Sequence, residues 1–131
     1  MKIKAYRNQN ISAMARIGWI PSNSINSIEV YVHTDDSGMI PHFHVRKYSK
    51  NGHPEWETCI KFDSAEYYLH GRYKDRLPKG VAYEMNKMFK EVNPKRRGLT
   101  FWQSAIDDWN NNNSSIQLDQ NLEQPDYCEL Q

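Results

Sequence analysis

The chain has 131 residues, a formal net charge of +1 and 38% hydrophobic residues, with a mean hydropathy of −0.89. This length fits one domain. No apolar run approaches the roughly 20 residues that a membrane helix needs, and the first residues lack the apolar stretch of a secretory signal. We therefore expect a cytoplasmic protein without a membrane partner, in which the two distant cysteines, Cys59 and Cys128, are reduced.

Charge is distributed unevenly along the chain. All 17 lysines and arginines lie at or before Arg97, whereas the residues after Ile116 carry acidic charge alone. The basic excess of the body is compatible with a nucleic-acid partner, but the sequence pI of 7.8 lies below the value of about 9 that would argue for one. Residues 114–131 are polar and acidic, which predicts a mobile tail.

Strands are predicted early in the chain. Residues 1–26 show no clean hydrophobic period, so their structure is left open, and a domain of residues 27–113 follows. Apolar residues alternate with others from Ile28 to His33, which is the period of a half-buried strand. After an Asp-Asp-Ser-Gly turn, further strands are expected over residues 42–48, 57–62 and 65–72.

Two helices are predicted after the strands. The first starts near Pro78, because proline suits a first helical turn, and its apolar residues recur at spacings of three and four up to Val92. The second opens with Thr100-x-x-Gln103, the pattern of a capping box. Asparagines at 110–113 end it, because their side chains compete for helical hydrogen bonds.

Together these elements predict an α+β fold, in which a small antiparallel β-sheet of three to four strands is packed on one face by two C-terminal helices. Residues two apart on a strand share a face. The expected core is Ile28, Val30, Val32, Phe43, Val45, Ile60, Phe62, Val81, Met85, Phe89, Trp102, Ile106 and Trp109. The opposite face is expected to carry His33, His42, His44, Arg46, Tyr48, Cys59 and Lys61.

Two histidines in this opposite face, His42 and His44, are the candidate catalytic residues. They lie two positions apart in the segment Pro-His-Phe-His-Val, so their imidazoles share one face. With His33 and Cys59 they form a candidate set for a divalent metal or for acid–base chemistry near neutral pH. The alternative is that these are half-exposed strand residues that only hydrogen-bond to neighbouring groups.

Known templates for histidine sites fit poorly. A cupin-like metal site needs a glutamate a few residues after the second histidine, and residues 45–51 contain none. A histidine-triad nucleotide hydrolase needs a third histidine where Arg46 stands. No carboxylate lies at a fixed spacing to complete a facial triad. No cofactor signature is therefore found, and a divalent metal is the one cofactor that the sequence leaves open.

A second candidate region is the basic connector Lys95, Arg96 and Arg97, which directly precedes the second predicted helix. Cations beside the free N–H groups of a helix N-terminus can bind phosphate. A solvated linker between two helices is the alternative. The candidate binding residues are His33, Arg46, Tyr48, Lys95, Arg96 and Arg97.

The order of these motifs resembles a family of small bacterial proteins of unknown function, whose hallmark is a Pro-Pro-His-Phe-His segment. The resemblance covers residues 27–113, and Ile40 stands where the family has its first proline. Its motif positions are Pro41, His42, Phe43, His44, Leu77, Pro78 and Trp109. Members often occur in two-gene cassettes suspected to be toxin–antitoxin systems, so the resemblance implies a protein partner.

Two classes of function follow from these observations. The first is a small binding or regulatory protein that acts through the histidine-rich sheet face, within a toxin–antitoxin-like two-protein module or on nucleic acid. The second is a small metal- or histidine-dependent hydrolase that acts on a phosphodiester or nucleic acid. The missing carboxylate favours the first class, and the sequence leaves open whether the protein is an enzyme.

Overall fold

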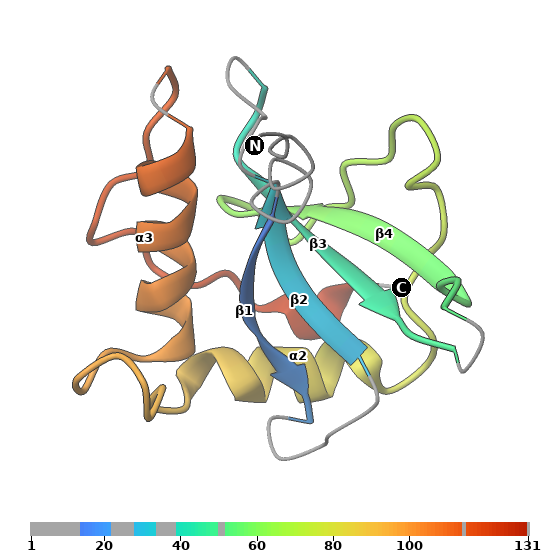
Figure 1. Ribbon diagram of the computed structural model, residues 1–131, viewed down its shortest axis with the longest axis horizontal. Coiled ribbons are helices and arrows are strands. Elements are labelled where there is room, and N and C mark those ends of the chain that lie inside the picture. The colour runs from blue at the N-terminus through green and yellow to red at the C-terminus, as the bar shows by residue number, and fades with distance from the viewer. Residues whose placement is uncertain (1–13, 22–27, 34–38, 50–51, 114, 131) are drawn as a thin grey trace, which may run out of the picture.

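The computed structural model describes residues 14–21, 28–33, 39–49, 52–113 and 115–130. It has the predicted α+β class, with four strands followed by two helices and a short 3-10 turn (Figure 1). The elements are β1 (Met14–Ile20), β2 (Ile28–His33), β3 (His42–Lys47), β4 (Trp56–Lys61), α2 (Val81–Lys90), α3 (Phe101–Asn112) and η2 (Tyr127–Glu129). The Asp-Asp-Ser-Gly turn predicted at residues 35–38, between β2 and β3, lies outside the described residues.

The sheet is fully antiparallel, in the order β1-β2-β3-β4. The register places Val30 opposite Val45 and Phe43 opposite Ile60, which confirms the predicted core face. β1 falls in the segment whose structure the sequence left open. A register shift between Arg16 and Gly18 inserts an extra residue there, and such a bulge breaks the period-2 alternation by which a strand is recognised.

Residues 65–72 do not form the predicted fourth strand. They make only isolated bridges, from Tyr67 to Ile60 and from His70 to Tyr73. Backbone hydrogen bonds from Tyr68 N to the Cys59 carbonyl and from Asp75 N to the Glu57 carbonyl hold this stretch along the free edge of β4. We call residues 66–76 the cover segment. It protects an edge strand without extending the sheet.

The core lies between the sheet and the two helices (Figure 1), and every predicted core residue belongs to it or packs against it. Met85 and Phe89 on α2, and Trp109 on α3, are fully buried. The predicted helix boundaries are less accurate. Helix α2 begins at Val81, after Pro78, and ends at Lys90, so Val92 lies outside the helix and is 59% exposed.

Helix α3 begins as the sequence predicts. The Thr100 hydroxyl accepts a hydrogen bond from Gln103 N, and the Gln103 side chain accepts one from Thr100 N, which completes the capping box. We expect Thr100→Ala to lower the free energy of unfolding by about 1 kcal/mol, because one cap donor loses its acceptor. Urea denaturation of the two proteins measures this. Equal midpoints would show that the cap adds nothing to stability.

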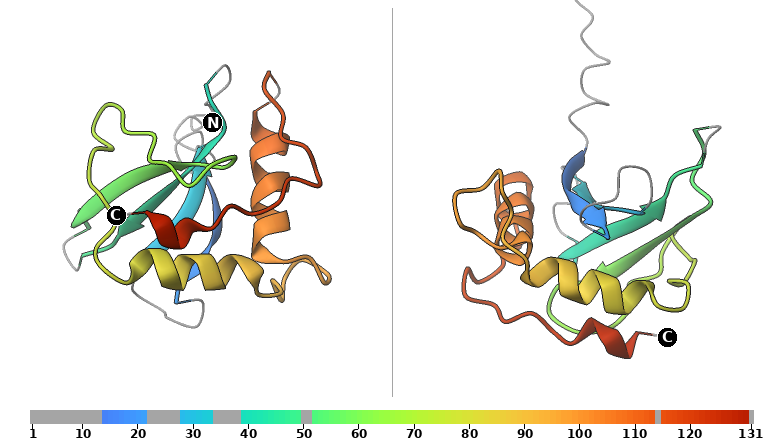
Figure 2. Two further views of the ribbon diagram at one scale, coloured as in Figure 1. Left: turned by 180° about the vertical axis from the view of Figure 1, so that it is seen from behind. Right: turned by 90° about the horizontal axis from the view of Figure 1, so that it is seen from below.

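Residues 115–130, for which the sequence predicts a mobile tail, pack against the two helices. They run back past α3 and along α2, where η2 lies beside the helix (Figure 2). Trp102 donates its indole N–H to the Leu122 carbonyl at 2.8 Å, and Tyr127 is completely buried. The apolar residues that pack are single and widely spaced, as Leu118, Leu122 and Tyr127 are, so they leave no periodic signal in a polar sequence.

Candidate functional site: a buried histidine cluster

The four predicted metal ligands meet on the sheet face opposite the core. Strand pairing places His44 opposite Cys59 on β4, and their side chains are in contact, with 3.1 Å between His44 Nδ1 and Cys59 Sγ. The His44 ring lies 4.2 Å from that of His33 and 5.0 Å from that of His42, centroid to centroid. Strand parity therefore predicted this convergence correctly.

The cover segment adds three rings that sequence reasoning missed. His70 lies 5.3 Å from His42, and Tyr73 lies 4.6 Å from His44, centroid to centroid. The Tyr73 hydroxyl is also 3.3 Å from His33 Nε2, and the Tyr68 ring packs against His42. We call His33, His42, His44, Cys59, Tyr68, His70 and Tyr73 the histidine cluster. The density of tyrosine and histidine in residues 67–73 was the available signal, but a strand assignment obscured it.

Burial of the cluster corrects the expectation of a half-exposed face. His42 is 0% exposed and His44 is 1% exposed, because the cover segment folds over them. His33, His70 and Tyr73 are half-buried and form the rim of the cluster. A buried imidazole must hydrogen-bond to nearby protein groups instead of water, so those hydrogen bonds determine what chemistry the ring can perform.

Two of the imidazoles are held by backbone carbonyls. His42 Nδ1 lies 2.7 Å from the Ile40 carbonyl oxygen, and His70 Nδ1 lies 2.8 Å from the Tyr68 carbonyl oxygen. A carbonyl can only accept a hydrogen bond, so in each ring Nδ1 carries the proton. In the neutral ring Nε2 is then the basic nitrogen, ready to accept a proton or bind a metal.

Three side chains of the cluster could hold a metal ion. His42, Cys59 and His70 each offer one ligand atom, and these atoms all lie within 4.8 Å of one another. The predicted set shares His42 and Cys59 with this group. Its other members, His33 and His44, contact the Tyr73 hydroxyl and the Cys59 sulfur instead.

The same sheet face carries a network of charges beyond the cluster. Glu29 is completely buried and accepts hydrogen bonds from the Nε atoms of Arg16 and Arg46. Arg46 also donates to the Tyr48 hydroxyl at 2.7 Å. Arg46 and Tyr48, predicted as binding residues, are thus engaged in contacts within the protein, because a buried glutamate needs cationic partners.

Tyr31 links this network to the cluster. Its ring stacks on His44 with centroids 5.0 Å apart, and its hydroxyl donates to a Glu57 carboxylate oxygen at 3.1 Å. Burial raises the pKa of Tyr31 far above its usual value of 10.0, and the nearby Glu57 carboxylate raises it further. In the folded protein Tyr31 therefore keeps its proton well into the alkaline range.

This raised pKa predicts a pH dependence of stability. The unfolded chain ionises Tyr31 above about pH 10 and the folded chain does not, so the stabilisation is complete below that pH and is lost above it, by about 1.4 kcal/mol per pH unit. Since the unfolded tyrosine is only half ionised at pH 10, we expect Tyr31→Phe to reduce the fall in unfolding free energy between pH 10 and 11 by about 1 kcal/mol. Urea titrations at both pH values measure it, and an unchanged slope would contradict the assignment.

In the structure, the predicted basic connector is tied to helix α3 through Arg96. One guanidinium nitrogen of Arg96, Nη2, donates to both carboxylate oxygens of Asp108, at 2.8 and 3.0 Å. Burial raises the pKa of Asp108, and the Arg96 hydrogen bond partly offsets this. Because the capping box already uses the amide of Gln103, the predicted phosphate site at this helix start loses a donor. Lys95 and Arg96 instead line a cavity of about 410 Å³ beside β1, together with Arg16, Ile17, Gly18, Trp19, Asn93, Pro94 and Phe101.

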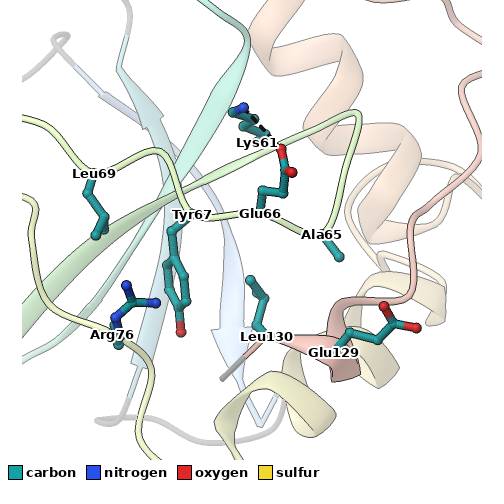
Figure 3. Close-up of a pocket in the computed structure, with 8 residues that line it drawn as sticks. All are labelled: Lys61, Ala65, Glu66, Tyr67, Leu69, Arg76, Glu129 and Leu130. Atoms are coloured by element: carbon teal, nitrogen blue, oxygen red, sulfur yellow. Dashed lines mark hydrogen bonds and ion pairs between the residues drawn. The ribbon is translucent and has the colours of Figure 1, made fainter.

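A larger cavity of about 570 Å³ lies beside the chain's C-terminal segment (Figure 3). In the close-up, the Arg76 guanidinium lies beside the Tyr67 ring, and Leu130 sits below the paired side chains of Lys61 and Glu66. The Arg76 carbon Cζ is 5.0 Å from the Tyr67 ring centroid. The lining mixes both signs of charge and contains no residue of the histidine cluster.

Comparison with known proteins adds no relative: no family model, no curated protein and no solved structure matches this chain. None of the helices in the described part of the chain is long and apolar enough to cross a lipid bilayer. The candidate site therefore stands on its own geometry.

Proposed function

We propose that this is a small binding or regulatory protein whose functional centre is the histidine cluster, with nucleic acid as the partner of the cover segment. The proposal keeps the first of the two classes that the sequence favours. We also propose membership in a two-protein module, which the family resemblance implies and which is compatible with this function.

One observation carries this choice over an enzyme. His42 and His44 lie completely beneath the cover segment, so a polymeric substrate has no direct approach to their imidazoles. Three cavities in the described part of the chain, of about 570, 410 and 470 Å³, are lined by side chains outside the cluster. An enclosed cluster is better suited to holding a segment of the chain in place than to turning over a bound strand.

The cover segment supplies the chemistry of a binding surface. Arg72, Lys74 and Arg76 are exposed on it. The guanidinium of Arg72 lies over the Tyr73 ring at 5.1 Å, and that of Arg76 lies over the Tyr67 ring. Cations interleaved with aromatic rings can bind both the phosphates and the bases of a single strand.

A hydrolase is the second candidate, because acid–base groups lie side by side in the cluster. The Tyr73 hydroxyl contacts His33 Nε2, and His44 contacts the Cys59 thiol. Movement of the cover segment would be required to admit a phosphodiester to these pairs.

Binding and cleavage of one labelled strand separate the two candidates. We expect the metal-free protein, in chelator, to bind a 12-nucleotide single-stranded RNA in fluorescence anisotropy. Replacing Arg72, Lys74 and Arg76 with glutamine should weaken binding at least tenfold and reduce its salt dependence. The matched control replaces Lys79, Lys87 and Lys90, on and before α2, with glutamine and should bind normally.

Each outcome of this experiment has a definite meaning. A strand that stays intact in gels while it binds supports the proposal. Equal binding by both triple variants, or no binding by the wild type, would contradict the cover segment as a nucleic-acid surface. Cleavage that His44→Gln abolishes, with divalent metal added, would overturn the proposal in favour of the hydrolase.

A further inference from the structure

We propose that His42, Cys59 and His70 form a binding site for a divalent transition metal of the zinc class, with the His44 imidazole as hydrogen-bond partner of the Cys59 sulfur. The inference rests on the proposed function in one respect, since it identifies the ligand of the same cluster. It differs from the set that the sequence suggests by using His70 from the cover segment.

The three ligand atoms are near enough to one another to bind a single ion. Their ligand atoms lie within 4.8 Å of one another. In a tetrahedral zinc site, bonds of about 2.0–2.1 Å to nitrogen and 2.3 Å to sulfur place the ligand atoms about 3.5 Å apart. Side-chain shifts of about an ångström therefore suffice, and the strands that carry His42 and Cys59 can stay where they are.

Both histidines are held in the way that metal-binding histidines usually are. Nδ1 of His42 is bound to the Ile40 carbonyl, and Nδ1 of His70 is bound to the Tyr68 carbonyl. Such a hydrogen bond fixes the ring orientation and makes Nε2 the ligating nitrogen. The same arrangement on two different parts of the chain, both facing one cysteine, is what a prepared metal site requires.

Donor chemistry selects the class of metal. Imidazole nitrogen together with thiolate sulfur suits zinc and similar transition metals, whereas magnesium and calcium require oxygen ligands. On binding, the Cys59 thiol loses its proton to the solvent buffer and the sulfur bonds to the metal, so each ion releases one proton at this residue. His44 Nδ1, 3.1 Å from Cys59 Sγ, can then donate to the buried thiolate.

The metal would also link two parts of the fold. His42 and Cys59 lie on neighbouring strands, whereas His70 begins a tight turn closed by hydrogen bonds with Tyr73. Gly71 follows with a φ of +53°, the conformation that such a turn requires. An ion bound by all three residues would tie this turn, and with it the basic cover segment, to the sheet.

Cobalt titration of the metal-free protein tests the site directly, because thiolate-bound tetrahedral cobalt has a characteristic absorption spectrum. We expect saturation near one ion per chain, with a sulfur-to-metal band that Cys59→Ser abolishes. His70→Gln should weaken zinc binding at least 100-fold in competition with a chromophoric chelator. His70 is only half-buried, so this variant keeps the test valid if Cys59→Ser fails to fold.

Matched controls and a second readout decide the remaining outcomes. Cys128→Ser and His53→Gln change exposed residues of the same types and should leave the spectrum and affinity unchanged. Loss of the sulfur-to-metal band in Cys128→Ser, or zinc affinity that is unchanged in His70→Gln, would contradict the proposed site. RNA binding is measured separately in chelator, so loss of the metal site and loss of the proposed function give different results.

Discussion

Replacing Tyr127 with alanine is expected to lower the free energy of unfolding by about 3–5 kcal/mol, as large-to-small changes of buried aromatic residues do. The ring is completely buried and lies 5.6 Å from that of Phe43 and 5.8 Å from that of Phe89, centroid to centroid. Its hydroxyl donates to the carbonyl oxygens of Lys61 and Phe62, at 3.0 Å each. The C-terminal segment is therefore part of the core.

Chemical denaturation with a matched variant tests this expectation. Glu123 is exposed in the same segment, and Glu123→Ala should change stability by no more than about 0.5 kcal/mol. Tyr127→Phe keeps the ring and should cost about 1 kcal/mol, because only the hydrogen bonds of the hydroxyl are lost. If the alanine variant unfolds at the wild-type denaturant concentration, residues 115–130 do not stabilise the fold.

Replacing Glu29 with alanine is expected to lower the free energy of unfolding by about 3–5 kcal/mol, because it removes the main partner of the partly buried Arg46 guanidinium. The Glu29 side chain is 0% exposed, and the Arg46 side chain that binds it is 17% exposed. Arg46 keeps weaker partners: the Tyr48 hydroxyl, the Met14 sulfur at 3.5 Å, the face of the Tyr31 ring and a Glu57 carboxylate at 4.0 Å. Because Arg16 is half-exposed and can be rehydrated, the lower end of the range is expected.

A surface ion pair provides the control for Glu29. Glu55 lies 3.8 Å from Lys47, with both side chains well exposed, and Glu55→Ala should change stability by less than about 0.5 kcal/mol. Thermal and urea midpoints of the two variants are compared at neutral pH. Similar midpoints for Glu29→Ala and Glu55→Ala would show that the buried network contributes no more than a surface pair.

The strands and helices were predictable because the spacing of apolar residues along the sequence reflects which side chains are buried. The alternation in β2 and β3, the stripe of α2 and the capping box at Thr100 each depend on neighbours within a few residues. β1 was not predictable, since its bulge at Ile17 interrupts the alternation. The packing of Tyr127 depends on residues more than 60 positions away, such as Lys61, and no local pattern carries that information.

The candidate site was predictable in part for the same reason. Strand parity placed His42 and His44 on one face, and pairing brought Cys59 beside them. His70 reaches the cluster because the cover segment leaves the path of a strand and turns at Gly71. That turn also buries the histidines, and sequence alone offered no measure of how the segment would fold over the sheet.

X-ray absorption at the zinc edge of protein loaded with one zinc ion per chain tests the central claim most directly, because it reads the atoms bound to the metal. With His42, Cys59 and His70 as ligands, the spectrum should show one sulfur at about 2.3 Å and two imidazole nitrogens at about 2.0–2.1 Å. The sulfur shell should vanish in Cys59→Ser, and one imidazole should be lost in His70→Gln. A spectrum of light atoms alone, unchanged in both variants, would contradict the histidine cluster as a metal centre.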